Sequence, residues 1–168
     1  MKNIILFTSF LFTSLCFAQN DRPQRDAFSL KLAVDGKQYY GMDVNVAPYF
    51  VKDKVLQIYP GDKLFIETEI KNDTIFSMKV VKENKFPKKT IELEFVQEAE
   101  DRAHKHMMLS VKNPFDKILK YDAFMYRVGS DTFVSTSIIP VMPGISGYET
   151  WQDVIITLVL DKWSLEKL

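Results

Sequence analysis

The chain has 168 residues, with 22 basic and 22 acidic side chains and one cysteine. This balance argues against nucleic acid as a partner, because phosphate-driven binding requires a marked basic excess. The single cysteine, Cys16, lies in a segment that we expect to be removed. The mature chain is therefore expected to use no disulfide, thiolate metal site or cysteine nucleophile.

Residues 1–18 have the pattern of a bacterial signal peptide. Lys2 supplies a positive charge, residues 4–17 are mostly apolar, and small residues precede a cleavage site between Ala18 and Gln19. The apolar stretch is shorter than the ~20 residues that span a bilayer. The sequence therefore predicts an exported protein, periplasmic or secreted, that does not span the membrane.

Cys16 also permits a lipoprotein signal, in which that cysteine would become the acylated first residue. Leu15 precedes it, however, and is bulkier than the small residue that such signals place there. We therefore expect cleavage after Ala18. Residues 19–26 are polar and are expected to be disordered, and residues 27–168 are expected to form a single β domain.

The first strands read as a hairpin. Residues 28–34 alternate apolar with other side chains, as in a half-buried strand. Asp35-Gly36 follows, and both residues tolerate the positive φ of a tight turn. Residues 40–46 then resume the alternation, so the hairpin is expected to have one apolar face.

Five further segments carry the strand pattern before residue 112. They are residues 55–59, 64–70, 74–81, 91–95 and 109–111. In the segment 74–81, Phe76, Met78 and Val80 are predicted to share the buried face. Residues 98–105 have no apolar stripe, and we expect a loop or a single helical turn there.

The last third predicts a second hairpin and a final strand. Residues 118–128 and 132–139 flank a Gly-Ser turn, and residues 154–160 form an apolar strand that ends before Trp163. Residues 140–148, with two prolines and two glycines, are expected to form a long loop.

Eight or nine short strands with turns between them favour an all-β fold. We expect an antiparallel, immunoglobulin-like β-sandwich that lacks the cysteine pair of antibody domains. A small closed β-barrel is the structural alternative.

Several short segments of the C-terminal half resemble a family of uncharacterised secreted bacterial proteins. The resemblance implies a compact β domain of unknown function and transfers no catalytic residue. It covers about a third of the chain. The segments are Asn113-Pro114-Phe115, Leu119-Lys120-Tyr121-Asp122-Ala123, Thr136-Ser137, Pro140-Val141 and Glu149-Thr150-Trp151.

His104 and His106 are the two histidines and the weak candidates for a metal site. In an extended strand, residues two apart lie on one face at a separation that two ligands of one zinc ion can bridge. In a polar loop, the same pair is ordinary solvent-exposed sequence. We therefore expect no metal and no cofactor.

Two glutamate pairs are the candidates for carboxylate catalysis. Glu67 with Glu69, and Glu92 with Glu94, each share a strand face, as paired glycosidase acids would. The alternation with core residues equally predicts a solvated sheet face. The sequence contains no nucleophile elbow, so we expect no catalytic residue and no enzymatic activity.

Aromatic side chains are the candidates for a binding surface. Tyr39, Tyr40, Tyr49 and Tyr59 cluster in the first third, and Trp151 flanks the loop at residues 140–148. Tyrosine and tryptophan are enriched at binding surfaces. They also fill sandwich cores, so the sequence leaves both interpretations open.

Two other features concern glycans. Residues 73–75 resemble an acceptor motif for O-glycosylation, which would modify Thr74. A lysine-rich loop offers positive charge to an anionic glycan or lipid head group, although a solvated loop is the expected interpretation. The lysines are Lys82, Lys85, Lys88 and Lys89.

These observations favour a non-catalytic binding or structural module of the bacterial cell envelope, with an envelope protein or a glycan as partner. The first alternative is a small-ligand carrier, which needs an internal pocket of ~300 Å³ or more. The second is a carboxylate-based hydrolase, which needs titratable groups converging in a cleft.

Overall fold

The computed structural model describes residues 23–168. The predicted signal peptide, its cleavage site at Ala18 and Gln19, and Cys16 all lie outside these residues. The described residues form fourteen strands and no helix. The strands are β1 (Gln24–Arg25), β2 (Phe28–Ala33), β3 (Tyr39–Val44), β4 (Ala47–Pro48), β5 (Phe50–Lys52), β6 (Val55–Ile58), β7 (Lys63–Lys71), β8 (Thr74–Val81), β9 (Thr90–Glu100), β10 (Ala103–Lys112), β11 (Ile118–Arg127), β12 (Val134–Thr136), β13 (Ser146–Trp151) and β14 (Ile155–Glu166).

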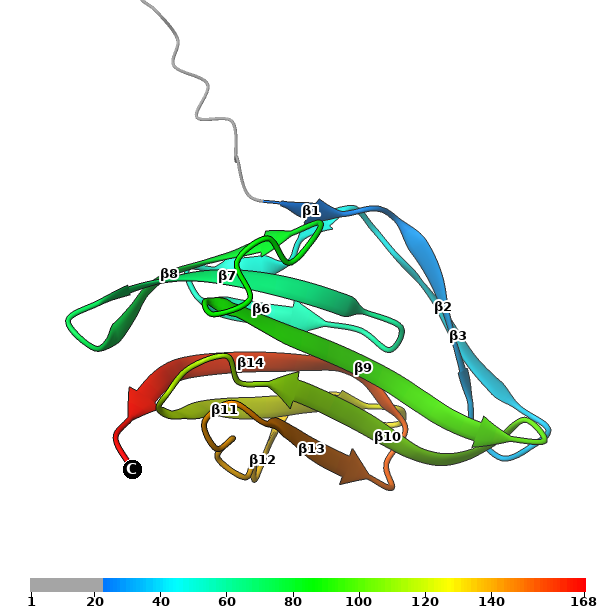
Figure 1. The fold of residues 1–168 in the computed structure, drawn as a ribbon. Coiled ribbons are helices and arrows are strands. Elements are labelled where there is room, and N and C mark those ends of the chain that lie inside the picture. The colour runs from blue at the N-terminus through cyan, green and yellow to red at the C-terminus, as the bar shows by residue number, and fades with distance from the viewer. Residues whose placement is uncertain (1–22) are drawn as a thin grey trace, which may run out of the picture.

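Ten of these strands form two antiparallel sheets of five strands each. One sheet has the order β13-β10-β9-β7-β8, and the other has the order β12-β11-β14-β6-β5. The sheets pack face to face (Figure 1). The predicted antiparallel β-sandwich is confirmed. The alternative of a closed barrel is wrong, because each sheet ends in two edge strands.

The main core lies between the two sheets and is filled by their own side chains. Ile66 and Phe95 from one sheet and Leu158 from the other are 0% exposed. They belong to one continuous cluster of buried residues. The strand alternation that predicted these segments is therefore explained by one face of each sheet turning toward the other.

The β2–β3 hairpin lies outside the two sheets, along one side of the sandwich (Figure 1). Leu30, Leu32 and Val44 form a second buried cluster with Ile156 of β14. The predicted hairpin and its apolar face are confirmed. Its turn is longer than a tight Asp-Gly turn, because the backbone N–H of Val34 donates to the carbonyl of Gln38 at 3.1 Å.

The β9–β10 hairpin replaces the loop or helical turn expected at residues 98–105. β9 continues to Glu100 and β10 begins at Ala103. Asp101 and Arg102 form the turn with positive φ angles of 48° and 67°. The weak alternation of this segment has a physical cause, since its side chains extend past the core and a bulge interrupts the register between His104 and His106.

β13 is a strand that the sequence analysis did not predict. It begins at Ser146, inside the expected loop at residues 140–148, and pairs with β10. The expected strand at residues 132–139 is shorter in the structure, where β12 covers only Val134–Thr136. The connection from β12 to β13 passes from one sheet to the other.

The buried face of β8 agrees with the prediction at Met78 and Val80, which pack in the main core, and differs at Phe76. Ile75 is 0% exposed, whereas Phe76 is 57% exposed. A bulge in β8 causes this change. The consecutive β7 residues Glu69 and Ile70 oppose Ser77 and Ile75, so Phe76 is the extra, unpaired residue of β8. The ring of Phe76 instead lies 3.6 Å from the Lys71 ammonium group.

The described part of the expected disordered N-terminus is ordered. Gln24–Arg25 form β1 and pair with β4. The Arg25 side chain is only 4% exposed and donates to the Asp62 carboxylate at 2.9 Å. The polar composition of residues 19–26 suggested disorder, but one of these polar groups has a buried, charged partner.

Candidate functional site

A group of exposed apolar side chains lies on the β12–β13 connection and the start of β13. Ile139, Met142, Ile145 and Tyr148 are 71%, 42%, 54% and 63% exposed. We call these four side chains the loop surface. They surround a hollow of about 240 Å³ that is also lined by the buried residues Tyr121 and Val141. Contiguous exposed apolar side chains of this kind typically mark interaction sites.

The connection that carries the loop surface is held in place by Asn113. This side chain is 0% exposed. Its amide nitrogen lies 2.7 Å from the Lys117 carbonyl, 2.9 Å from that of Val141 and 3.2 Å from that of Met142. Its amide oxygen accepts from the backbone N–H of Phe115 at 2.9 Å. One buried side chain thus joins the β10–β11 connection to the loop.

Backbone hydrogen bonds and close packing also hold this loop against the sandwich. Val141 and Leu119 exchange backbone hydrogen bonds, each 2.9 Å long. Gly147 lies directly against Val141, and a Cβ atom on Gly147 would come within 2.9 Å of a Val141 methyl group. The loop is therefore shaped by packing and hydrogen bonds, so little conformational entropy remains to be lost when a partner binds.

The electrostatics around the hollow are simple. Glu149 is the one charged residue among those that line it. Its carboxylate accepts from the backbone N–H of Ile139 at 2.6 Å. At the base, the Tyr121 ring stacks on Trp163 with centroids 4.7 Å apart. Burial raises the pKa of Tyr121 above its usual range, so this phenol remains neutral at physiological pH.

Of the predicted aromatic candidates, the structure brings Tyr49 and Tyr59 together. Both rings lie against the Arg25 guanidinium, at 4.6 and 4.7 Å. Arg25 also donates to the Gln57 carbonyl at 2.7 Å. Partial burial raises the pKa of both tyrosines. These two rings therefore have a structural partner in this protein.

The other three aromatic candidates lie apart from this pair. Tyr40 packs on the hairpin cluster. Tyr39 is 42% exposed, and its ring faces the Lys31 ammonium group at 4.2 Å. Trp151 packs on the main core and donates to the Thr136 hydroxyl at 2.9 Å. The five residues do not form one surface.

The two histidines lie on either side of the β10 bulge. Gln97 donates from its side-chain nitrogen to Nδ1 of His104 at 3.0 Å, and Nε2 of the same ring donates to the Gln152 carbonyl at 3.1 Å. This arrangement requires a neutral ring. Partial burial lowers the pKa of His104 in the same direction. Among the described residues, no group of three or more metal-ligating side chains is found.

The candidate carboxylate pairs lie on the outward-facing side of β7 and β9, next to lysines. Glu67 pairs with Lys89 at 3.1 Å, and Glu92 pairs with Lys112 at 3.0 Å. The partners of the remaining two are Lys71 for Glu69, at 3.1 Å, and Lys63 for Glu94, at 4.0 Å.

The glycan-related candidates occupy surface turns. Thr74 is exposed at the start of β8, directly after Asn72 and Asp73, which have positive φ angles. In the lysine-rich loop, Lys85 pairs with Glu83 at 2.9 Å. Lys89 of the same loop is engaged by Glu67, as described above.

The sequence pointed to the loop after residue 140 as one possible binding element, but not to the individual residues of the loop surface or to Asn113. Ile139, Ile145 and Tyr148 are separated by prolines and glycines, so no period of two or of 3.6 marks them as one face. Asn113 was named only as part of a segment that carries a family resemblance. The only sequence signal for such a surface is an apolar side chain next to turn residues. This signal had pointed to Trp151, which lies near the loop surface but is not part of it.

No family model, curated protein or solved structure matches this chain. Within residues 23–168, the structure contains no helix of the length and apolar character needed to cross a membrane.

Proposed function

We propose that this chain is exported and acts as a non-catalytic binding module of the bacterial cell envelope, with a partner protein on the loop surface. The observation that carries the proposal is the exposure of four large apolar side chains on a loop that Asn113 holds rigid. Burial of apolar surface stabilises a complex by ~25 cal/mol per Å². A rigid loop also lowers the entropic cost of binding.

The shape and charge of the hollow favour a protein partner. Its volume of about 240 Å³ is below the ~300–1,000 Å³ of small-ligand sites. A partner's apolar or aromatic side chain fits such a hollow as an anchor, in the way that interface hot spots pair. A lipid-binding loop typically carries basic residues, whereas Glu149 supplies the charge here.

Photo-cross-linking tests this proposal in the cells that produce the protein. A benzoylphenylalanine residue at Tyr148 is expected to form a defined adduct with one envelope protein. The same residue at Phe133, which is also exposed, is the matched control and is expected not to form it. The absence of an adduct specific to position 148 would overturn the proposal.

Titration of the purified partner then locates the binding energy. The double variant Ile139→Ser/Ile145→Ser is expected to bind about tenfold more weakly, because apolar anchors dominate interface energies. Phe76→Ser/Phe133→Ser removes the same kind of exposed side chain elsewhere and is expected to bind like the wild type. Equal affinity of both double variants for the partner would contradict the proposal. A second contradicting result would be that the wild type binds anionic phospholipid vesicles and that the Ile139→Ser/Ile145→Ser variant does not.

Export rests on the sequence of residues 1–18 and has its own test. The mass of the protein isolated from its cell envelope is expected to correspond to a chain that begins at Gln19. A mass that includes residues 1–18, or an acylated chain that begins at Cys16, would contradict this part of the proposal.

A further inference from the structure

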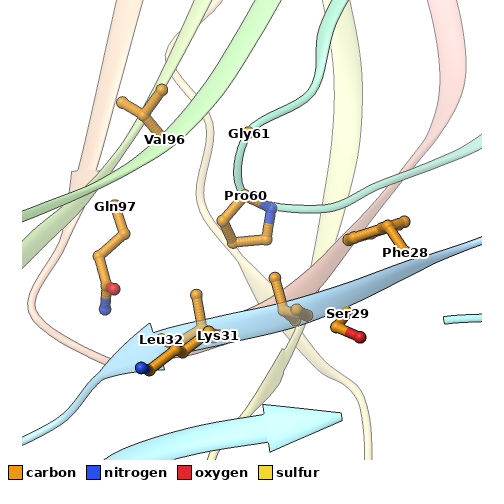
Figure 2. Close-up of a pocket in the computed structure, with 9 residues that line it drawn as sticks. Phe28, Ser29, Lys31, Leu32, Pro60, Gly61, Val96 and Gln97 are labelled. Atoms are coloured by element: carbon orange, nitrogen blue, oxygen red, sulfur yellow. The ribbon is translucent and has the colours of Figure 1, made fainter. Parts of the chain in front are cut away.

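A second hollow lies beside the β2–β3 hairpin. It is an open groove of about 420 Å³ that is lined by residues 28–32 of β2, by Pro60 and Gly61, and by Val96 and Gln97 of β9. Figure 2 shows β2 along one wall, with Gln97 pointing toward that strand from β9. The groove shares no lining residue with the hollow of the loop surface.

The wall formed by β2 is an open strand edge. β2 pairs with β3 on its other side. The Val34–Gln38 backbone bond sets the alternation of the ladder, so the N–H and C=O groups of Ser29, Lys31 and Ala33 point away from β3. Within residues 23–168, no backbone or side-chain partner satisfies these groups of Ser29 and Lys31.

The side chains of the same two residues leave this edge uncovered. The Ser29 hydroxyl donates to the Asp43 carboxylate on β3 at 2.6 Å. The Lys31 ammonium group lies over the Tyr39 ring, also on β3, at 4.2 Å. Both side chains are therefore engaged on the hairpin itself. A lysine that projects over an edge strand normally discourages pairing, and here it is directed elsewhere.

The third outward-facing residue shows which chemistry fits the edge. Ala33 donates from its N–H to the Gln97 side-chain oxygen at 2.8 Å and accepts from the Gln97 side-chain nitrogen at 2.9 Å. A carboxamide thus occupies this position as the peptide group of a neighbouring strand would. The next two outward positions, Lys31 and Ser29, open into the groove.

We propose that the groove is a docking site for an extended polypeptide segment of another protein, which adds to the open edge of β2 as a strand. Outward-facing residues two apart in a strand repeat every ~6.8 Å. An extended peptide backbone presents complementary donors and acceptors with this period. Phe28 of β2, together with Pro60 and Val96 of the other walls, provides apolar contacts for the side chains of that segment.

The experiment uses a phage-displayed library of random peptides that is selected on the purified mature protein. Selected peptides are synthesised and titrated against the wild type, Lys31→Pro and Lys31→Thr. Proline removes the outward N–H of residue 31 and no bond to β3, and edge strands tolerate it. Threonine removes the charge but keeps the N–H. We expect the Lys31→Pro variant to bind about tenfold more weakly and Lys31→Thr to bind like the wild type.

Hydrogen exchange on the wild type provides a readout that does not depend on the folding of a variant. Bound peptide is expected to slow exchange of the Ser29 and Lys31 amides. N-methylation of the peptide at alternate residues is expected to abolish binding in one register and to leave it intact in the other, because alternate amides of a strand face opposite edges.

Three results would overturn this inference. The first is that no peptide is enriched on the wild type. The second is that selected peptides bind Lys31→Pro as well as the wild type and leave the Ser29 and Lys31 amides unprotected. The third is concentration-dependent protection of these amides without peptide, which would identify a second copy of the chain as the occupant. Because the Ile139→Ser/Ile145→Ser variant leaves the groove intact, failure here is distinguishable from failure of the proposed function.

Discussion

The side-chain amide of Asn113 donates to the carbonyl oxygen of Val141 at 2.9 Å, inside the protein and 28 residues along the chain. Val141 belongs to the loop that displays the apolar surface, and Asn113 directly follows β10. A single buried amide therefore links the core of the sandwich to the surface that we propose for binding. Because of this link, substitution of the buried Asn113 is expected to disturb the loop, although Asn113 is not one of its exposed residues.

Replacement of Asn113 by alanine is expected to destabilise the protein by about 3 kcal/mol. The change removes the partner of the Lys117 carbonyl and of the Phe115 N–H, and each buried group left unsatisfied costs ~1–3 kcal/mol. Urea denaturation followed by tryptophan fluorescence measures the change. Asn45→Ala, at an exposed position, is the control and is expected to lie within about 0.5 kcal/mol of the wild type. Equal stability of the two variants would contradict the anchoring role of Asn113.

Alanine at Gly147 is expected to displace the loop from Val141. The new Cβ atom would lie 2.9 Å from a methyl group of a stiff, buried valine. Overpacking of this kind costs ~1–3 kcal/mol. Gly41→Ala is the matched control, because a Cβ there meets only the Leu30 carbonyl at 3.9 Å. Thermal unfolding should show a lower Tm for Gly147→Ala only, and a lower Tm for Gly41→Ala alone would argue against the packing described here.

Removal of the Arg25 side chain is expected to loosen β1 and the turn after β6. Arg25→Ala leaves the Asp62 carboxylate, which is 16% exposed, without its cation. Loss of one partner of a buried ion pair costs about 3 kcal/mol. Arg25→Lys is expected to restore only part of this energy, since lysine lacks the planar fork that reaches Asp62 and Gln57 between two tyrosine rings.

Chemical denaturation of these variants decides the point. Lys37→Ala, which removes an exposed cation on the hairpin turn, serves as the control for a change in net charge. A stability of Arg25→Ala equal to that of Lys37→Ala would show that the contacts of the Arg25 side chain contribute nothing to the stability of the fold.

Acidification is expected to weaken the attachment of the hairpin. The pKa of His104 is lowered in the folded protein, chiefly by burial. The unfolded chain, with a pKa of about 6.5, therefore binds a proton more readily than the folded chain. The stabilising contribution of neutral His104 is fully present at pH values above the unfolded pKa, and it is lost as the pH falls through the lower pKa of the folded protein. Protonation also places two donors against each other, at Gln97 and His104.

The matched variant for this prediction is His104→Gln, which keeps an acceptor for Gln97 but does not titrate. Denaturation between pH 7.5 and 5.5 should show a smaller loss of stability for His104→Gln than for the wild type. His106→Gln removes the other histidine and is expected to follow the wild type. A pH dependence of His104→Gln that is identical to that of the wild type would rule out this histidine as the source.

Strand alternation made much of the fold predictable. Leu30, Leu32 and Val44 were expected on one face of a hairpin, and they are buried together. The period of two is a local property, because successive side chains in any strand point to opposite sides. The prediction at Phe76 was wrong because a bulge in β8 leaves that residue unpaired. The prediction at residues 98–105 was wrong because a bulge between His104 and His106 of β10 interrupts the alternation.

The candidate site was less predictable. Tyr49 and Tyr59 were singled out for their chemistry, but the burial of Arg25 between them depends on a contact across the fold. The loop surface was found only in the structure, because its side chains have no sequence period and are aligned by Asn113.

The sequence by itself determined most of the strands, most of their apolar faces and the absence of cysteine after Cys16, because these depend on residue type and local geometry. The tertiary structure decided how β13 pairs with β10, which edge of β2 stays open and which loop side chains face solvent. These properties depend on contacts between residues far apart in the chain. Several tertiary arrangements of the strands are compatible with the same alternation of apolar and polar residues. The pairing register of the strands and the hydrogen bonds of buried polar groups select one of these arrangements.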